Sequence, residues 1–252
     1  MLLKRIIPCL LLENQRLVKT EKFLNPIYVG DPINAVKIFS EKEADEIIII
    51  DIGASKKKFI DFKLLSNIFN QCFVPITYGG GITTLEDAKK IFNLGAEKIS
   101  LQSTFFDNKD LIKSLVKYFG SQSIILSIDI KKNLFGKYKI WNYRKNSFYK
   151  KETIEKILNE IQELGIGELM ITDVDNEGTM SGTNKSLIIE ISKDINIPLI
   201  FNGGISSIDD MKESFESGTD GIAVGSFFVF YGKHKAVLIT YPTDQIKSLI
   251  NE

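Results

Sequence analysis

An internal repeat constrains the fold more than any other feature of the sequence. The segments Tyr78–Ser103 and Phe201–Ser226 share eight residues at a constant offset of 123 positions, which is close to half of the 252-residue chain. The shared positions are Gly80, Gly81, Ile82, Asp87, Phe92, Gly95, Ile99 and Ser103, which recur as Gly203, Gly204, Ile205, Asp210, Phe215, Gly218, Ile222 and Ser226. Duplication and fusion of a half-domain is the simplest account of such a repeat.

Apolar, β-branched runs alternate with helical stretches along the chain. Each run is continuous rather than alternating, which is typical of parallel strands buried on both faces. The predicted strands are Arg5–Leu11, Glu46–Ile52, Pro75–Tyr78, Glu97–Leu101, Ser123–Asp129, Glu168–Thr172, Pro198–Asn202 and Asp220–Val224. Eight such units in 252 residues predict an α/β fold, a (βα)8 TIM barrel of two pseudo-symmetric half-barrels that spans 1–252 as a single domain.

Two connections are longer than the rest. Leu12–Gly30 follows the first predicted strand, and Lys131–Lys151 follows the fifth and has the composition of a polar hairpin or lid. Both are therefore expected at the C-terminal face of the barrel, where long βα loops usually cover an active site.

The repeat also predicts two anion sites, because each copy places a glycine pair between a strand and a helix. Backbone N–H groups and the helix dipole favour a phosphate at that position. The pair Gly203-Gly204, with Gly225-Ser226 after the eighth strand, occupies the usual phosphate site of a barrel. Gly80-Gly81 with Gln102-Ser103 forms its pseudo-twofold mate. Two such sites suggest a long substrate with a phosphate at each end; the alternative is that both pairs are only tight turns.

Composition excludes several function classes. Lys plus Arg and Asp plus Glu each number 32, and this balance argues against non-specific nucleic-acid binding. His234 is the only histidine, and Cys9 and Cys72 form no CxxC motif, so we expect no catalytic triad, no metal and no cofactor. The N-terminal apolar run is broken by Pro8 and is too short to span a membrane. We expect a buried first strand and a cytoplasmic protein without membrane attachment.

Acids at strand ends are the default catalytic candidates on the C-terminal face. Asp129 ends an apolar run beside the predicted lid, and its carboxylate could move protons during a ring closure if a second acid lay opposite. Half-barrel symmetry places that partner at Leu11, which cannot transfer a proton. The other strand-end acids are Asp51, Asp173 and Asp175.

From Met1 to about Asp244 the chain resembles the HisF family, the cyclase subunit of imidazole glycerol phosphate synthase. The matching segments are Lys4–Leu10, Val18-Lys19, Gly30–Pro32, Asp45-Glu46, Asp51-Ile52, Gly79–Ile82, Phe119–Gln122, Ile128-Asp129, Gly165 with Gly167-Glu168, Gly178-Thr179 with Ser181-Gly182, and Gly203-Gly204. The resemblance implies that ammonia enters from a glutaminase docked under the barrel and passes through its core to a bisphosphorylated ribonucleotide at the mouth.

The resemblance also implies residue roles. Lys19 would be the lysine of the first loop that closes over substrate, and Asp129 one of the paired catalytic aspartates. The ammonia entrance would be a charged ring of Arg5, Glu46, Lys98 and Glu168, whose alternative is an ordinary salt-bridged barrel floor. The substrate side would include Asp51, Ser103, Thr172, Glu177, Gly178 and Thr179.

Three positions depart from the family pattern. Leu11 stands where the family has an aspartate, Gln102-Ser103 where it has Asn-Thr, and Glu177 where it has Asp before Gly-Thr. The segments Ile7–Leu12, Gly30–Phe39 and Gly225–Pro242 resemble the HisF paralogues of surface-polysaccharide gene clusters, which carry leucine at the first of these positions. That resemblance implies a glutaminase-like partner, an amidotransferase, and the building of acetamidino groups on sugars.

Two alternatives stay open beside this hypothesis. The chain could be an authentic cyclase that uses Asp129 with a substitute acid, Glu177 or Asp51. It could also be a non-catalytic activator of a glutaminase, although a scaffold has no need of phosphate loops. His234, in the tail Gly232–Tyr241, is open to either a chemical or an interface role.

Overall fold

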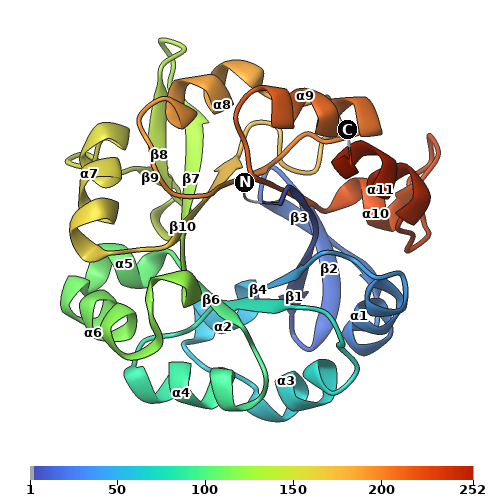
Figure 1. The fold of residues 1–252 in the computed structure, drawn as a ribbon, viewed down its shortest axis with the longest axis horizontal. Coiled ribbons are helices and arrows are strands. Elements are labelled where there is room, and N and C mark those ends of the chain that lie inside the picture. The colour runs from blue at the N-terminus through green and yellow to red at the C-terminus, as the bar shows by residue number, and fades with distance from the viewer. Residues whose placement is uncertain (1–2, 252) are drawn as a thin grey trace.

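The computed structural model describes residues 3–251, and it contains a closed barrel of eight parallel strands surrounded by helices (Figure 1). Strand β1 pairs with β12 on one side and β4 on the other, and β7 pairs with β10, so the ring closes. The barrel strands are β1 (Arg5–Glu13), β4 (Ile47–Asp51), β5 (Ile76–Gly79), β6 (Lys98–Leu101), β7 (Ile124–Lys132), β10 (Glu168–Asp173), β11 (Leu199–Asn202) and β12 (Gly221–Val224). The predicted TIM barrel is confirmed, and each predicted strand overlaps an observed one.

Helices form the outer layer, and the main apolar core lies between them and the strands. A second, smaller core fills the inside of the barrel and includes Ile7, Ile48, Ile125, Met170 and Ile200. The helices are α1 (Pro32–Glu41), α2 (Ile52–Lys57), α3 (Phe62–Phe69), α4 (Leu85–Asn93), α5 (Ser103–Asp107), α6 (Lys109–Phe119), α7 (Ile154–Leu164), α8 (Lys185–Ser192), α9 (Ile208–Glu216), α10 (Ser226–Val229) and α11 (Thr243–Asn251).

The repeated sequence forms a similar N-terminal cap at the start of α4 and of α9. The Thr84 hydroxyl accepts a hydrogen bond from the amide of Asp87 at 3.0 Å, and the Asp87 carboxylate accepts one from the amide of Thr84 at 2.9 Å. In the other half, the Ser207 hydroxyl accepts from the amide of Asp210 at 3.1 Å. Each half-barrel therefore begins the corresponding helix with a side-chain cap on its first amides.

Both long connections, Leu12–Gly30 and Lys131–Lys151, contain antiparallel strand pairs. Strands β2 (Arg16–Glu21) and β3 (Leu24–Gly30) extend the end of β1 antiparallel. Within Lys131–Lys151 the predicted hairpin is confirmed, because β7 runs on to pair with β8 (Tyr138–Asn142). The other short elements at this end are η2 (Tyr143–Lys145), β9 (Ser147–Phe148), β13 (Phe230–Tyr231) and β14 (Ala236–Val237), whereas η1 (Ser121–Ser123) precedes β7 at its N-terminal end.

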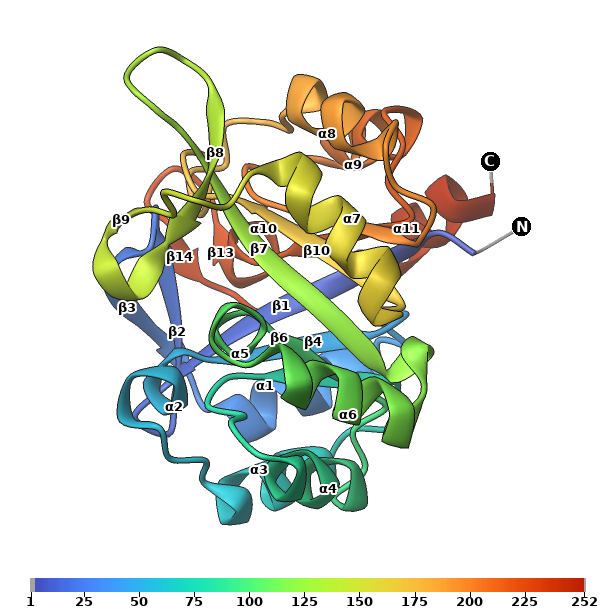
Figure 2. The same cartoon turned by 90° about the vertical axis from the view of Figure 1, so that its left-hand side faces the viewer.

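All of these hairpins lie at one end of the barrel, and both chain ends lie at the other (Figure 2). The hairpin end is the C-terminal end of the strands, where the sequence predicts the site. Exposed His234 lies in the turn between β13 and β14. Within residues 3–251, no helix is long and apolar enough to cross a membrane.

Candidate active site

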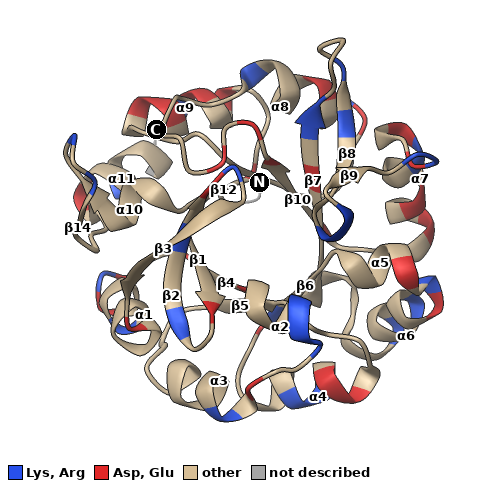
Figure 3. Ribbon diagram, turned by 180° about the vertical axis from the view of Figure 1, so that it is seen from behind, with Lys and Arg blue, Asp and Glu red and all other residues tan. Residues whose placement is uncertain are grey.

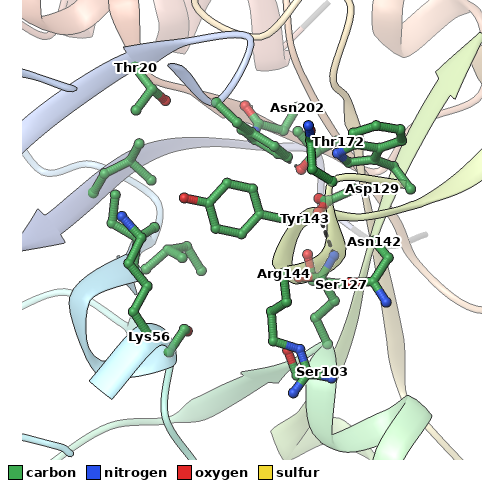
Figure 4. Close-up of a pocket in the computed structure, with 18 of the residues that line it drawn as sticks. Thr20, Lys56, Ser103, Ser127, Asp129, Asn142, Tyr143, Arg144, Thr172 and Asn202 are labelled. Carbon is green, nitrogen blue, oxygen red and sulfur yellow. Dashed lines mark hydrogen bonds between the residues drawn. The ribbon is translucent and has the colours of Figure 1, made fainter. Parts of the chain in front are cut away.

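A cavity of about 620 Å³ opens at the C-terminal end of the barrel (Figure 4). Asp129, Leu11, Ser103 and Thr172 all line it, so the structure brings these four predicted residues together. The two long hairpins meet at this cavity, where the rings of Phe23 and Tyr143 pack edge to face with centroids 5.5 Å apart.

Asp129 is buried at the end of the barrel core, and the side-chain amide of Gln102 donates a 2.5 Å hydrogen bond to its Oδ2. Burial raises the pKa of Asp129 to about 7, with a further upward push from the charge of Glu177; the hydrogen bond from Gln102 opposes both. A carboxyl group with this pKa exists in both protonation states near neutral pH. Asp129 can therefore take up or release a proton at low energetic cost.

Leu11 contributes to an apolar wall of the same cavity. It pairs with Ile50 of β4 on one side and with Val18 of β2 on the other, and Ile50 and Ile52 line the cavity beside it. Among the described residues that line this cavity, Asp129 is the only carboxylic acid. The described lining of this cavity therefore contains no pair of carboxylic acids.

The second copy of the repeat forms a small hollow next to the main cavity, and Asn202 lines both. Six predicted residues meet in this hollow: Lys19, Gly178, Gly203, Gly204, Gly225 and Ser226. The aliphatic part of Lys19 lies over Gly225, where an added Cβ would be only 2.8 Å from Lys19 Cε. Glycine at this position leaves room for the Lys19 side chain to lie against the turn after β12.

Lys19 forms a buried ion pair with Glu177, and it also donates a 2.9 Å hydrogen bond to the carbonyl of Thr20. Glu177 in turn accepts hydrogen bonds from the Thr20 hydroxyl at 3.1 Å and the Phe23 amide at 2.9 Å. The β2–β3 hairpin is thus tied to the loop after β10 through this carboxylate and through a 2.8 Å hydrogen bond from the amide of Lys22 to the carbonyl of Glu177. Glu177 itself does not line either cavity.

The first copy of the repeat is arranged differently from the second. Gly80 and Gly81 pack on the backbone that follows β4, and a Cβ on Gly80 would lie 2.3 Å from the carbonyl oxygen of Asp51. Asp51 caps α2, since its Oδ1 accepts a 2.7 Å hydrogen bond from the amide of Ala54. Gln102 and Ser103 line the main cavity, whereas Asp51, Gly80, Gly81 and also Thr179 line neither cavity.

Four charged side chains form a closed ring at the opposite, N-terminal end of the barrel. Arg5 pairs with Glu46 at 2.7 Å and also with Glu168. Lys98 pairs with Glu46 at 3.0 Å and with Glu168 at 2.9 Å. Both glutamates are buried, whereas the cations retain about a fifth of their exposure (20% for Arg5 and 18% for Lys98). The four predicted residues therefore meet, with alternating charge, directly below the apolar interior of the barrel.

Sequence reasoning missed several residues of the cavity. Lys56 and Lys58 reach it from α2 and the residue after it, and Tyr143 and Arg144 reach it from η2 in the lid (Figure 4). The signal available was the run Trp141–Arg144, since aromatic and basic residues within a predicted lid are typical of ligand contacts.

Comparisons with known proteins agree with this architecture. Residues 5–235 match the family described as "Histidine biosynthesis protein". A Pseudomonas aeruginosa protein is 43% identical over 96% of this chain and 97% of its own length. Its name describes it, provisionally, as the imidazole glycerol phosphate synthase subunit hisF2. The imidazole glycerol phosphate synthase subunit HisF of Helicobacter hepaticus is 36% identical over 97% of each chain. The chain therefore belongs to the HisF family of histidine-biosynthesis proteins.

Proposed function

We propose that this protein is a HisF-type synthase subunit that accepts ammonia from a glutaminase partner and uses or delivers it at the mouth of the barrel. The observation that carries the proposal is the charged ring of Arg5, Glu46, Lys98 and Glu168, which lies under an apolar barrel interior leading to the cavity of Asp129. A HisH-like glutaminase would bind the N-terminal face. Uncharged ammonia suits an apolar interior, whereas ammonium would pay a large desolvation penalty there.

The substrate that we propose is an anionic small molecule with phosphate groups at its ends. One end would bind in the hollow of Lys19, Gly203, Gly204 and Ser226, where backbone amides and a lysine converge. The other end would bind near Ser103, at the side of the cavity that carries the cations. Thr172 and Asn202 lie between, joined by a 3.3 Å hydrogen bond, and offer polar contacts to the middle of the ligand.

We further propose that the ring-closing step of the family is lost or altered here, and that the ammonia serves acetamidino-sugar biosynthesis with an amidotransferase as a further partner. Leu11 leaves Asp129 without a second acid in the cavity. The pattern among relatives supports this: the Pseudomonas protein and a Vibrio vulnificus protein at 42% identity bear names of second or third copies of the subunit.

An authentic imidazole glycerol phosphate synthase cyclase is the alternative, and the neutral-range pKa of Asp129 favours it. Its substitute acid would have to be Glu177 or Asp51. Glu177 is engaged by Lys19 and Asp51 by the amides of α2, and neither lines the cavity. A protein that only activates a glutaminase would not need the hollow around Lys19.

Complex formation with a HisH-like glutaminase from the same organism tests the proposal. We expect a stable complex in which glutamine hydrolysis is faster than with the glutaminase alone, and we expect Lys98→Met to lower that stimulation. Lys113→Met, which removes an exposed lysine from α6, serves as the matched control. The absence of both a complex and a stimulation would contradict the proposal.

A further inference from the structure

The main cavity carries an excess of positive charge that no predicted residue explains. Three cations line it, Lys56, Lys58 and Arg144, against the single carboxyl of Asp129, in a chain whose net charge is zero. Figure 3 shows basic segments on α2 and on the β7–β8 hairpin. Lys56 lies in α2 and Lys58 directly follows it, and Arg144 lies in η2, directly after β8. Such a local excess favours an anionic ligand at this side of the mouth.

Arg144 is the cation best placed to hold that ligand. It belongs to η2, in the lid, and its side chain extends along the cavity toward Ser103 (Figure 4). Aromatic contacts on both sides fix its position: Tyr143 packs on Phe23, and Tyr149 stacks on Phe106 with centroids 4.1 Å apart. The lid thus presents a guanidinium whose backbone is already anchored, which reduces the entropy lost when a ligand binds.

The present partner of Arg144 is easily displaced. Its guanidinium pairs with Asp107 at 2.8 Å, but the side chains are 37% and 54% exposed. An exposed ion pair of this kind contributes little to stability. Two oxygens of a phosphate can accept the same pair of guanidinium hydrogen bonds and carry a higher charge, so a phosphate can replace the Asp107 carboxylate without leaving a buried group unpaired.

We propose that Arg144 is a ligand-binding and specificity-determining residue that holds the phosphate at the Ser103 end of the substrate. Ser103 contributes its hydroxyl to the same phosphate. Lys58, which has no ion-pair partner within the described part of the chain, adds a second positive charge. Because Arg144 is carried by the lid, phosphate binding at this end also holds the lid against the barrel. The inference rests on the proposed phosphate-ended substrate and adds the residue that selects for it.

Trp141 makes this inference measurable. It is the only tryptophan in the chain, it lies in the lid three positions before Arg144, and it lines the cavity. Its fluorescence therefore reports ligand binding at the lid without interference from other tryptophans. Two probes each carry one phosphate: imidazole glycerol phosphate and aminoimidazole carboxamide ribonucleotide. We expect one of them to occupy the Ser103 end and the other the Lys19 end.

The experiment titrates both probes into wild type, Arg144→Gln, Arg144→Lys and Lys19→Gln, and follows Trp141 fluorescence and heats of binding. Arg144→Gln should weaken one probe about 10- to 100-fold, as expected for loss of a charge-assisted contact, and leave the other within about twofold. Lys19→Gln should weaken the second probe and leave the affinity for the first nearly unchanged. Arg144→Lys should recover only part of the affinity, since it keeps the positive charge but loses the paired N–H donors of the guanidinium.

Lys137→Gln is the control, because it removes an exposed charge from the same lid at a position that does not line the cavity. Wild-type affinity of Arg144→Gln for both probes would overturn the role of Arg144 while leaving the proposed function intact. If wild type itself binds neither probe nor inorganic phosphate, the proposed phosphate-ended substrate fails as well.

Discussion

Leu11 of β1 and Asp129 of β7 line the same cavity, and of the two only Asp129 can exchange a proton. The surroundings of the two residues differ accordingly. Asp129 is buried with a hydrogen bond from Gln102, whereas Leu11 lies with Ile50 and Ile52 on an apolar wall. The side of the cavity at Leu11 is therefore apolar, whereas the side at Asp129 is polar.

The raised pKa of Asp129 predicts a pH dependence of stability. Between about pH 4, where an ordinary aspartate ionises, and pH 7, the folded state keeps a proton that the unfolded state releases. The free energy of unfolding should therefore fall as pH rises through this window. Asp129→Asn removes the effect and should be more stable than wild type at pH 8 by a few kcal/mol, at roughly 1.4 kcal/mol per pKa unit. Urea denaturation at pH 4.5, 6 and 8 measures it; equal pH slopes in both proteins would count against the burial of a titrating Asp129.

The charged ring should contribute to stability as a unit. Glu46→Ala leaves Arg5 and Lys98 to share Glu168 and leaves the hydroxyl of Thr77 without its 2.7 Å acceptor. We expect a loss of about 2–4 kcal/mol in the free energy of unfolding, near the range for breaking a buried pair. Glu86→Ala, which breaks an exposed pair with Lys89, should cost less than about 1 kcal/mol. Equal costs for the two variants would show that the ring does not act as a buried network.

The glycines of the repeat should differ in their tolerance of alanine. Gly204 has φ +84°, and an added Cβ would lie 2.1 Å from the carbonyl oxygen of Gly182, which is backbone and cannot move freely. Gly95 has φ +114°, but a Cβ there meets nothing within 4 Å. Gly95→Ala should cost about 1–2 kcal/mol from backbone strain alone, and Gly204→Ala at least about 2 kcal/mol more. Thermal unfolding of the two variants measures this difference in stability, and similar unfolding midpoints would contradict the prediction.

The barrel was predictable because each of its strands is a short, continuous apolar run, and because the repeat fixes the spacing of the two halves. The hairpin of β2 and β3 was not, since its pairing depends on the tail of β1 and on the Glu177 carboxylate, which is far away in sequence. The starts of two helices follow from local residues, since the side chain of Thr84 caps α4 and that of Asn108 caps α6.

Within the site, residues on strand ends could be placed from sequence, whereas residues brought in by tertiary contacts could not. Asp129 and Leu11 follow from strand register alone. The helix-capping role of Asp51, which removes it from the cavity wall, depends on where α2 begins. Arg144 reaches the cavity only because the lid folds back across the mouth.

We propose that ring-closing chemistry is lost or altered at position 11 while the substrate site persists. The direct measurement is ammonia-dependent turnover of the bisphosphorylated ribonucleotide by the purified protein at high ammonium, for wild type, Leu11→Asp and the size-matched control Leu11→Asn. We predict that wild type and Leu11→Asn turn over at least about 10²-fold more slowly than Leu11→Asp, the usual effect of losing one member of an acid–base pair. Wild-type turnover on the order of 1 per second, typical of enzymes, would contradict the account and show that another acid replaces position 11.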